Sequence, residues 1–213
     1  MKLSDFKNIF CINLSRRPDR WLWCKQQFQT HQINGVIRFN AIDGNDLKIT
    51  PEMSMDGNMI SMGYYGCLFS HLAIVRIAKQ MKLSNYVVFE DDFQLHRNFN
   101  ELFNKYYEQV PSDWDMIYLG ANHSNGTDKI SENVVKMKGS FTTHSMIIKN
   151  TIYGDLINGW SNFHEKVDII ISRLHRQHNS YCFTPNLCVQ KDDFSDILNR
   201  NIVNAGYMKD DFE

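Results

Sequence analysis

YVVFEDD, residues 86–92, passes from four β-branched and aromatic residues directly into three acidic ones. A short, continuous apolar run of this kind is typical of a strand buried on both faces of a parallel sheet. In open α/β sheets, ligands bind just beyond the carboxyl ends of the strands. Residues 86–92 therefore predict a buried strand that ends in carboxylates at the ligand-binding edge of a sheet.

Strand and helix patterns alternate on both sides of this segment. Apolar runs predict further strands at residues 8–14, 33–42 and 114–119, and apolar residues at helical spacing predict helices at 17–31, 64–82 and 99–109. Strands that alternate with helices form parallel sheets with a helix layer on each face. We therefore expect an α/β fold with a Rossmann-type, mostly parallel sheet and helices on both faces.

The second half of the chain has shorter and less regular patterns. We expect strands at residues 134–137, 145–148 and 181–190, helices at 151–160 and 166–178, loops at 45–62 and 122–132, and a charged tail at 191–213. The loop at 45–62 is long for a compact domain, which favours a lid or a binding loop.

Composition excludes several classes of protein. The 213 residues suffice for one α/β domain, and a net charge of −1 argues against a nucleic-acid binder. The five cysteines have no CxxC pair, which favours reduced thiols. No apolar run is long enough for a signal peptide or a membrane span. We expect a cytoplasmic protein, in a bacterium or in the host cell of a virus; the oligomeric state is not predicted.

The acidic triplet is the first candidate site. Alternate side chains of an extended chain face the same way, so Glu90 and Asp92 can converge on one ion while Asp91 turns aside. Carboxylate oxygens are the ligands that Mg²⁺ and Mn²⁺ prefer, and such an ion would bridge a diphosphate. The alternative is a solvated acidic turn that caps the next helix.

Two further constellations accompany the triplet. Asn13, Arg16, Arg17 and Arg20 follow the first predicted strand, where arginines suit a phosphate or a base edge. Gly66, Ser70 and His71 lie in the long helix after the loop, where a glycine permits the close approach of a ligand. The alternatives are an exposed basic helix start for the first group and a core histidine for the second.

Several motifs in the same order resemble glycosyltransferase family 25, the family of lipooligosaccharide and procollagen galactosyltransferases. The motifs are INLSRRPDRW (12–21), GCLFSH (66–71), VFEDD (88–92), YLG (118–120), TTHSMIIKN (142–150), Val167-Asp168, and the segment from Pro185 through Gln190 to Ser195-Asp196-Ile197. The resemblance covers residues 8–198. It departs from the family pattern at Glu90, where Asp is common, and at Thr143-His144.

The resemblance implies one GT-A-like domain over residues 1–213. Its nucleotide-sugar-binding half would be about 1–120 and its acceptor-side half about 121–198, with 199–213 as a tail. It also implies an inverting transferase that moves galactose or glucose from a UDP-sugar to a hydroxyl of a glycan or of hydroxylysine in a collagen-like protein. Lipopolysaccharide biosynthesis and collagen glycosylation are the corresponding processes.

Residue roles follow from the same resemblance. Glu90 and Asp92 would bind Mn²⁺ or Mg²⁺, with His144 or Gln190 as a third ligand. The donor-binding residues would be Asn13, Arg16, Arg20, Ser70, His71 and Asp91. Asp168 would be the catalytic base. Two alternatives stay open: a nucleotidyltransferase, which would need a glycine-rich phosphate loop that INLSRRPDR lacks, and an inactive protein that only binds a nucleotide-sugar or a glycan.

Overall fold

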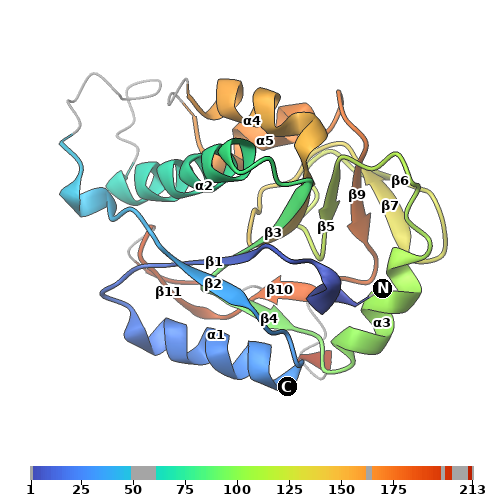
Figure 1. Ribbon diagram of the computed structural model, residues 1–213, viewed down its shortest axis with the longest axis horizontal. Coiled ribbons are helices and arrows are strands. Elements are labelled where there is room, and N and C mark those ends of the chain that lie inside the picture. The colour runs from blue at the N-terminus through green and yellow to red at the C-terminus, as the bar shows by residue number, and fades with distance from the viewer. Residues whose placement is uncertain (1, 49–60, 162–164, 198–199, 203–210, 213) are drawn as a thin grey trace.

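The structure is a computed structural model that describes residues 2–48, 61–161, 165–197, 200–202 and 211–212. Its centre is an eight-stranded sheet in the order β2-β1-β3-β8-β5-β9-β7-β6 (Figure 1). The strands are β1 (Ile9–Asn13), β2 (Val36–Asn40), β3 (Asn85–Glu90), β5 (Met116–Tyr118), β6 (Thr127–Lys129), β7 (Val134–Met137), β8 (Ser145–Lys149) and β9 (Ser180–Phe183).

Six of these eight strands point in the same direction. Strands β2, β1 and β3 form a parallel block, β5 and β9 pair in parallel, and β8 and β7 run antiparallel to their neighbours. The mostly parallel direction of the sheet is thus confirmed, while the two reversed strands make its second half mixed. The expected α/β architecture is confirmed.

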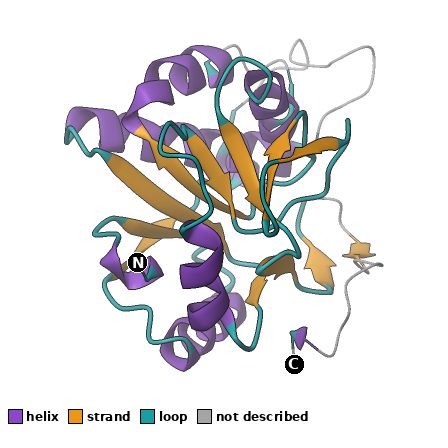
Figure 2. Ribbon diagram, turned by 90° about the vertical axis from the view of Figure 1, so that its right-hand side faces the viewer, coloured by secondary structure: helices purple, strands orange, loops and turns teal. Residues whose placement is uncertain are grey.

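Helices cover both faces of the sheet. Helices α2 (Met62–Gln80), α4 (Tyr153–Trp160) and α5 (Val167–Leu174) lie on one face, and α1 (Pro18–Thr30) and α3 (Phe99–Tyr107) lie on the other (Figure 1). Figure 2 shows the sheet edge-on between the two helical layers. Proline at the first position of α1 starts that helix without the loss of a backbone hydrogen bond, as the sequence predicts.

Alternate residues of the central strands supply two separate cores. Tyr86 and Val88 of β3 pack under α2 and α4, whereas Val87 and Phe89 pack toward α1 and α3. This is the two-residue period of a strand buried on both faces. The apolar run at residues 86–89 therefore anchors β3 between both helical layers, and it fixes where Glu90 leaves the sheet.

The sequence patterns do not predict four short strands, β4 (Phe93–Leu95), β6, β11 (Asp193–Ser195) and β12 (Arg200–Ile202). Strand β6 lies inside the predicted loop at 122–132. Strand β4 pairs with β10 (Cys188–Gln190), which lies in the strand predicted at 181–190, and β11 pairs with β12. The predicted tail is thus structured at residues 193–195 and 200–202. Helix α5 ends at Leu174 rather than at residue 178. The lid or binding loop predicted at 45–62 falls mostly on residues 49–60, outside the described part of the chain.

Among the helices that the structure describes, none combines the length and the apolar character needed to cross a bilayer.

Candidate active site

Two pockets meet at the carboxyl end of β3. The first, here called the β2 pocket, includes Arg16, Ile42, Asp43, Ser70 and Asp91 in its wall. The second, here called the α5 pocket, includes Tyr64, Phe141, Thr143, Asp168 and Gln190. Six residues line both pockets: Arg20, Cys67, Glu90, Asp92, Ser195 and Ile197. Glu90 and Asp92 therefore stand on the wall between two cavities, at the sheet edge that the sequence predicts.

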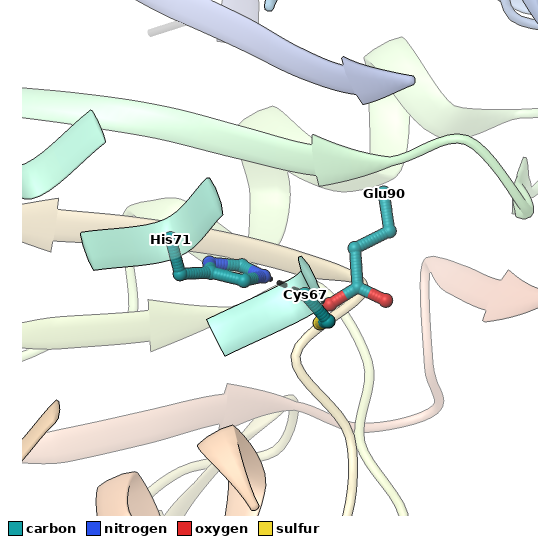
Figure 3. A group of neighbouring side chains, drawn as sticks. All are labelled: Cys67, His71 and Glu90. Atoms are coloured by element: carbon teal, nitrogen blue, oxygen red, sulfur yellow. Dashed lines mark hydrogen bonds and ion pairs between the residues drawn. The ribbon is translucent and has the colours of Figure 1, made fainter. Parts of the chain in front are cut away.

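Glu90 is held from two sides. Its Oε1 is 2.9 Å from Nε2 of His71 and accepts a hydrogen bond of 2.6 Å from the hydroxyl of Thr143. Burial raises the pKa of Glu90, but the interactions with His71, Thr143 and His144 together outweigh burial and leave the pKa lowered overall. Figure 3 shows that the other carboxylate oxygen points away from His71. Glu90 is thus a fixed carboxylate that keeps one oxygen turned away from its partners.

Asp91 turns to the opposite side, as the alternation of an extended chain predicts. Its two oxygens accept hydrogen bonds from Nδ2 of Asn13, at 2.6 Å, and from Arg20, at 2.8 Å. Burial raises the pKa of Asp91, and the charge of Arg20 opposes that rise. Asn13 is fully buried and also accepts from Arg38. Asn13 and Arg20, predicted as donor-binding residues, therefore hold Asp91 and fix the turn after β3.

Asp92 is the least satisfied of the three carboxylates. Oδ2 accepts a hydrogen bond of 3.2 Å from Gln190, while Oδ1 is shielded from solvent and has no hydrogen-bond partner among the described residues. Burial, followed by the negative charge of Glu90, raises the pKa of Asp92 to about 7. A buried carboxylate oxygen without a partner is costly unless a ligand satisfies it. Of the three carboxylates, Asp92 is therefore the one that most clearly requires a positively charged ligand.

Cys67 and His71 complete the wall behind Glu90. They lie four residues apart on one face of α2, and their ligand atoms and that of Glu90 all lie within 4.8 Å of one another (Figure 3). His71 is buried, with its ring 5.8 Å from that of Trp160. His71 thus lies in the core behind Glu90, and its predicted role in donor binding stays a prediction.

Gly66 and Ser70 hold the loop after β2 against α2. A Cβ at Gly66 would lie 2.5 Å from the carbonyl oxygen of Ile42, so the glycine lets the loop after β2 cross α2 closely. The Ser70 hydroxyl donates to the Gly66 carbonyl and accepts from the Ile42 amide. Gly66 and Ser70 both line the β2 pocket, and their predicted roles toward a ligand stay predictions.

Arginines after β1 hold the segment that follows β11. Arg16 bonds Asp43 and Asp196, each at 2.6 Å, and Arg17 forms a very short ion pair with Asp196. Arg16 lines the β2 pocket, and 44% of its side chain is exposed. Sequence analysis placed Arg16 at the pocket and Asp196 in a family motif, but it did not predict their ion pair, because the two residues lie 180 positions apart.

Asp168 faces the triplet across the α5 pocket. It lies in the first turn of α5, where its Oδ1 accepts from the Ile169 amide. Burial raises the pKa of Asp168, and the charge of Glu90 adds to the rise. A half-buried carboxylate with a raised pKa that lines a pocket fits a proton acceptor. Asp168 shares the lining of this pocket with Glu90 and Asp92, and its catalytic role stays a prediction.

The two suggested third ligands differ in position. Gln190 lines the α5 pocket and bonds Asp92. His144 is buried, with Nε2 bonded to the Cys188 carbonyl at 3.2 Å, and its backbone carbonyl accepts from the Glu90 amide. The position beside Asp92 favours Gln190, whereas the ring of His144 supports β10 from within the core.

Comparison with known proteins gives a family for this arrangement. The model of "Glycosyltransferase family 25 (LPS biosynthesis protein)" matches residues 6–207. The human protein "Inactive glycosyltransferase 25 family member 3" is 29% identical over 135 residues, which are 56% of this chain and 22% of that protein. Mouse "Procollagen galactosyltransferase 2" is 27% identical over 130 residues, 54% of this chain and 21% of that protein.

This chain thus spans between a fifth and a quarter of the length of these relatives. Among solved structures, mouse xyloside xylosyltransferase 1 superposes with a TM-score of 0.44 and 10% identity, over 80% of this chain and 69% of that one. The family match covers every constellation described above, from Asn13 to Asp196. The chain belongs to glycosyltransferase family 25.

Proposed function

We propose that this protein transfers a hexose, galactose or glucose, from a UDP-sugar to a hydroxyl group of an acceptor. The observation that carries the proposal is the placement of Glu90 and Asp92 on the shared wall of two pockets. A transferase must bring a donor and an acceptor to one reacting centre. Two adjoining cavities with paired carboxylates between them are the shape that this task requires.

The paired carboxylates also fit a divalent cation. Oδ1 of Asp92 is buried without a hydrogen-bond partner among the described residues, and Glu90 turns one oxygen away from His71. Hard oxygen ligands of this kind suit Mn²⁺ or Mg²⁺, with Gln190 within reach of Asp92 as a third oxygen ligand. When bound, such an ion supplies electrostatic stabilisation to a diphosphate leaving group.

The β2 pocket is the proposed donor side. Arg16 is the exposed cation of that pocket, and its guanidinium is oriented by Asp43 and Asp196. Arg20 and Asn13 hold the Asp91 carboxylate, which fixes the turn that carries Asp92. We propose that Arg16 and the Asp91 turn position the nucleotide, and that Ser70 and His71 act from behind the wall by holding the Ile42 loop and Glu90.

The α5 pocket is the proposed acceptor side. Its wall includes Phe141, 56% exposed, and the half-buried Tyr64, whose ring has Lys166 Nζ 4.5 Å from its centroid. Aromatic rings in a pocket wall suit the apolar faces of sugars. Asp168 would take the proton from the attacking hydroxyl, which then reaches the sugar carbon from the face opposite the diphosphate. The acceptor would be a glycan or the hydroxylysine of a collagen-like chain.

A second candidate function is nucleotide-sugar binding without transfer. The human relative named above carries "Inactive" in its name. In this chain, however, Asp92 keeps an unpartnered buried oxygen among the described residues, and a carboxylate of that kind is expensive to retain without a ligand.

The experiment is a screen of UDP-sugars for release of UDP, with Mn²⁺, with Mg²⁺ and with EDTA. We expect release from UDP-galactose or UDP-glucose that requires the ion, and loss of release in Asp92→Ala. Binding of UDP without release of UDP from any donor would favour a protein that binds nucleotide-sugars without transferring the sugar. Full activity of Asp92→Ala would overturn the metal assignment.

A further inference from the structure

Cys67, His71 and Glu90 form a group of ligand atoms, of which the proposed transfer reaction uses only those of Glu90 to bind a cation. Their Sγ, Nε2 and Oε1 atoms lie within 4.8 Å of one another (Figure 3). Bonds from Zn²⁺ to sulfur, nitrogen and oxygen measure about 2.0–2.3 Å, so two ligand atoms of a tetrahedral ion lie about 3.3–3.8 Å apart. The three atoms are therefore within about 1 Å of the spacing that a single ion imposes.

The residues sit on two rigid elements. Cys67 and His71 share one face of α2, and Glu90 ends β3 in the centre of the sheet. Thr143 donates to Glu90 at 2.6 Å and fixes its carboxylate from the side of β8. Such preorganised ligands lower the cost of binding an ion.

The group is also reachable. Four of the five cysteines are buried, whereas Cys67 is partly exposed and lines both the β2 pocket and the α5 pocket. An ion can therefore enter from either cavity. The fourth coordination position would face the pockets and take a water molecule.

We propose that Cys67, His71 and Glu90 bind a thiophilic divalent cation, of the class of Zn²⁺ and Cd²⁺, at a site distinct from the oxygen-lined site of Asp92. One thiolate, one imidazole and one carboxylate are a ligand set that suits Zn²⁺ and disfavours Mg²⁺ and Mn²⁺. Binding releases the thiol proton of Cys67 and any proton on Nε2 of His71 to solvent.

Glu90 would be a ligand in both sites, so the two ions would compete for its carboxylate. A thiophilic ion draws Glu90 toward α2 and removes one carboxylate from the hard-cation site. Zn²⁺ would thus antagonise Mn²⁺ and inhibit transfer. This consequence rests on the proposed function, whereas the binding site itself does not.

The test is titration of the purified metal-free protein with Cd²⁺, followed by the ultraviolet charge-transfer absorption of a cadmium–thiolate bond. We expect a saturable band with one Cd²⁺ per chain, abolished in Cys67→Ser and weakened at least tenfold in affinity in His71→Asn. Cys182→Ser, a change at a buried cysteine away from the site, is the matched control and should retain the band.

Asp92→Asn separates the two sites. It should leave Cd²⁺ affinity within about twofold of wild type while it removes the response to Mn²⁺, because Asp92 belongs only to the oxygen-lined site. X-ray absorption of the wild-type cadmium complex should give one sulfur ligand, and this result does not depend on any variant folding. No band in wild type, a band that persists in Cys67→Ser, or an equal loss in Asp92→Asn would each overturn the proposal.

Discussion

Replacing Asp92 by Asn should stabilise the metal-free protein and remove its function. Burial and the nearby charge of Glu90 raise the pKa of Asp92 from 3.8 to about 7. The folded protein therefore holds a proton on Asp92 between about pH 4 and pH 7 that the unfolded chain releases. The free energy of unfolding falls as pH rises through this window, and the loss is complete above it.

The magnitude follows from the two pKa values. One pKa unit corresponds to about 1.36 kcal/mol, so the raised pKa of Asp92 lowers the free energy of unfolding by about 2 kcal/mol at pH 5 and about 4 kcal/mol at pH 8. Asparagine keeps the shape of aspartate and has no charge to bury. The advantage of Asp92→Asn over wild type should thus grow by about 2–3 kcal/mol between these pH values.

The assay is urea unfolding in EDTA at pH 5 and pH 8, followed by circular dichroism. Glu90, whose pKa is lowered, contributes stability that is lost only below its usual range, so it leaves this window unaffected. Added Mn²⁺ should stabilise wild type at pH 8 and leave Asp92→Asn unchanged. A variant that is less stable than wild type at pH 8, or equally dependent on pH, would refute the reasoning.

Three further changes test other parts of the site. Asp168→Asn should retain UDP binding by calorimetry and lose at least about 100-fold in transfer rate; loss of binding as well would mean a structural role. Gly66→Ala should lower the free energy of unfolding by about 1–3 kcal/mol, because its Cβ would lie 2.5 Å from a loop carbonyl oxygen; an unchanged melting temperature would contradict that contact. Arg20→Met should lower the free energy of unfolding by about 3–5 kcal/mol, because it leaves the Asp91 carboxylate buried without its cation. The exposed Arg97→Met serves as its control, with an expected change below about 0.5 kcal/mol.

Sequence patterns located the parts of the site that depend on local order. The apolar run at 86–89 predicts β3, and alternation after it predicts the opposite directions of Asp91 and its two neighbours. Both properties arise from the two-residue period of a strand, which is readable in a single sequence. The helical period of α2 can also be read from the sequence, because its apolar stripe extends over five turns.

Features that depend on distant partners were not predictable. Strands β4, β6 and β11 have three residues each and exist because another strand pairs with them. Asp196 reaches Arg16 across 180 positions of sequence. Gly66 was correctly singled out as a site of close approach, but what approaches it is the Ile42 carbonyl of the same chain. Residue type shows that space is needed, and only the fold shows what fills it.

In the proposed function, Glu90 and Asp92 hold a divalent cation between a UDP-sugar and its acceptor. The most direct measurement is a crystal structure with Mn²⁺ and UDP, with data collected at the manganese absorption edge. We predict one anomalous peak bonded to oxygens of Glu90 and Asp92, with the diphosphate beside it in the β2 pocket. A peak away from both carboxylates, or UDP bound outside that pocket, would contradict the account.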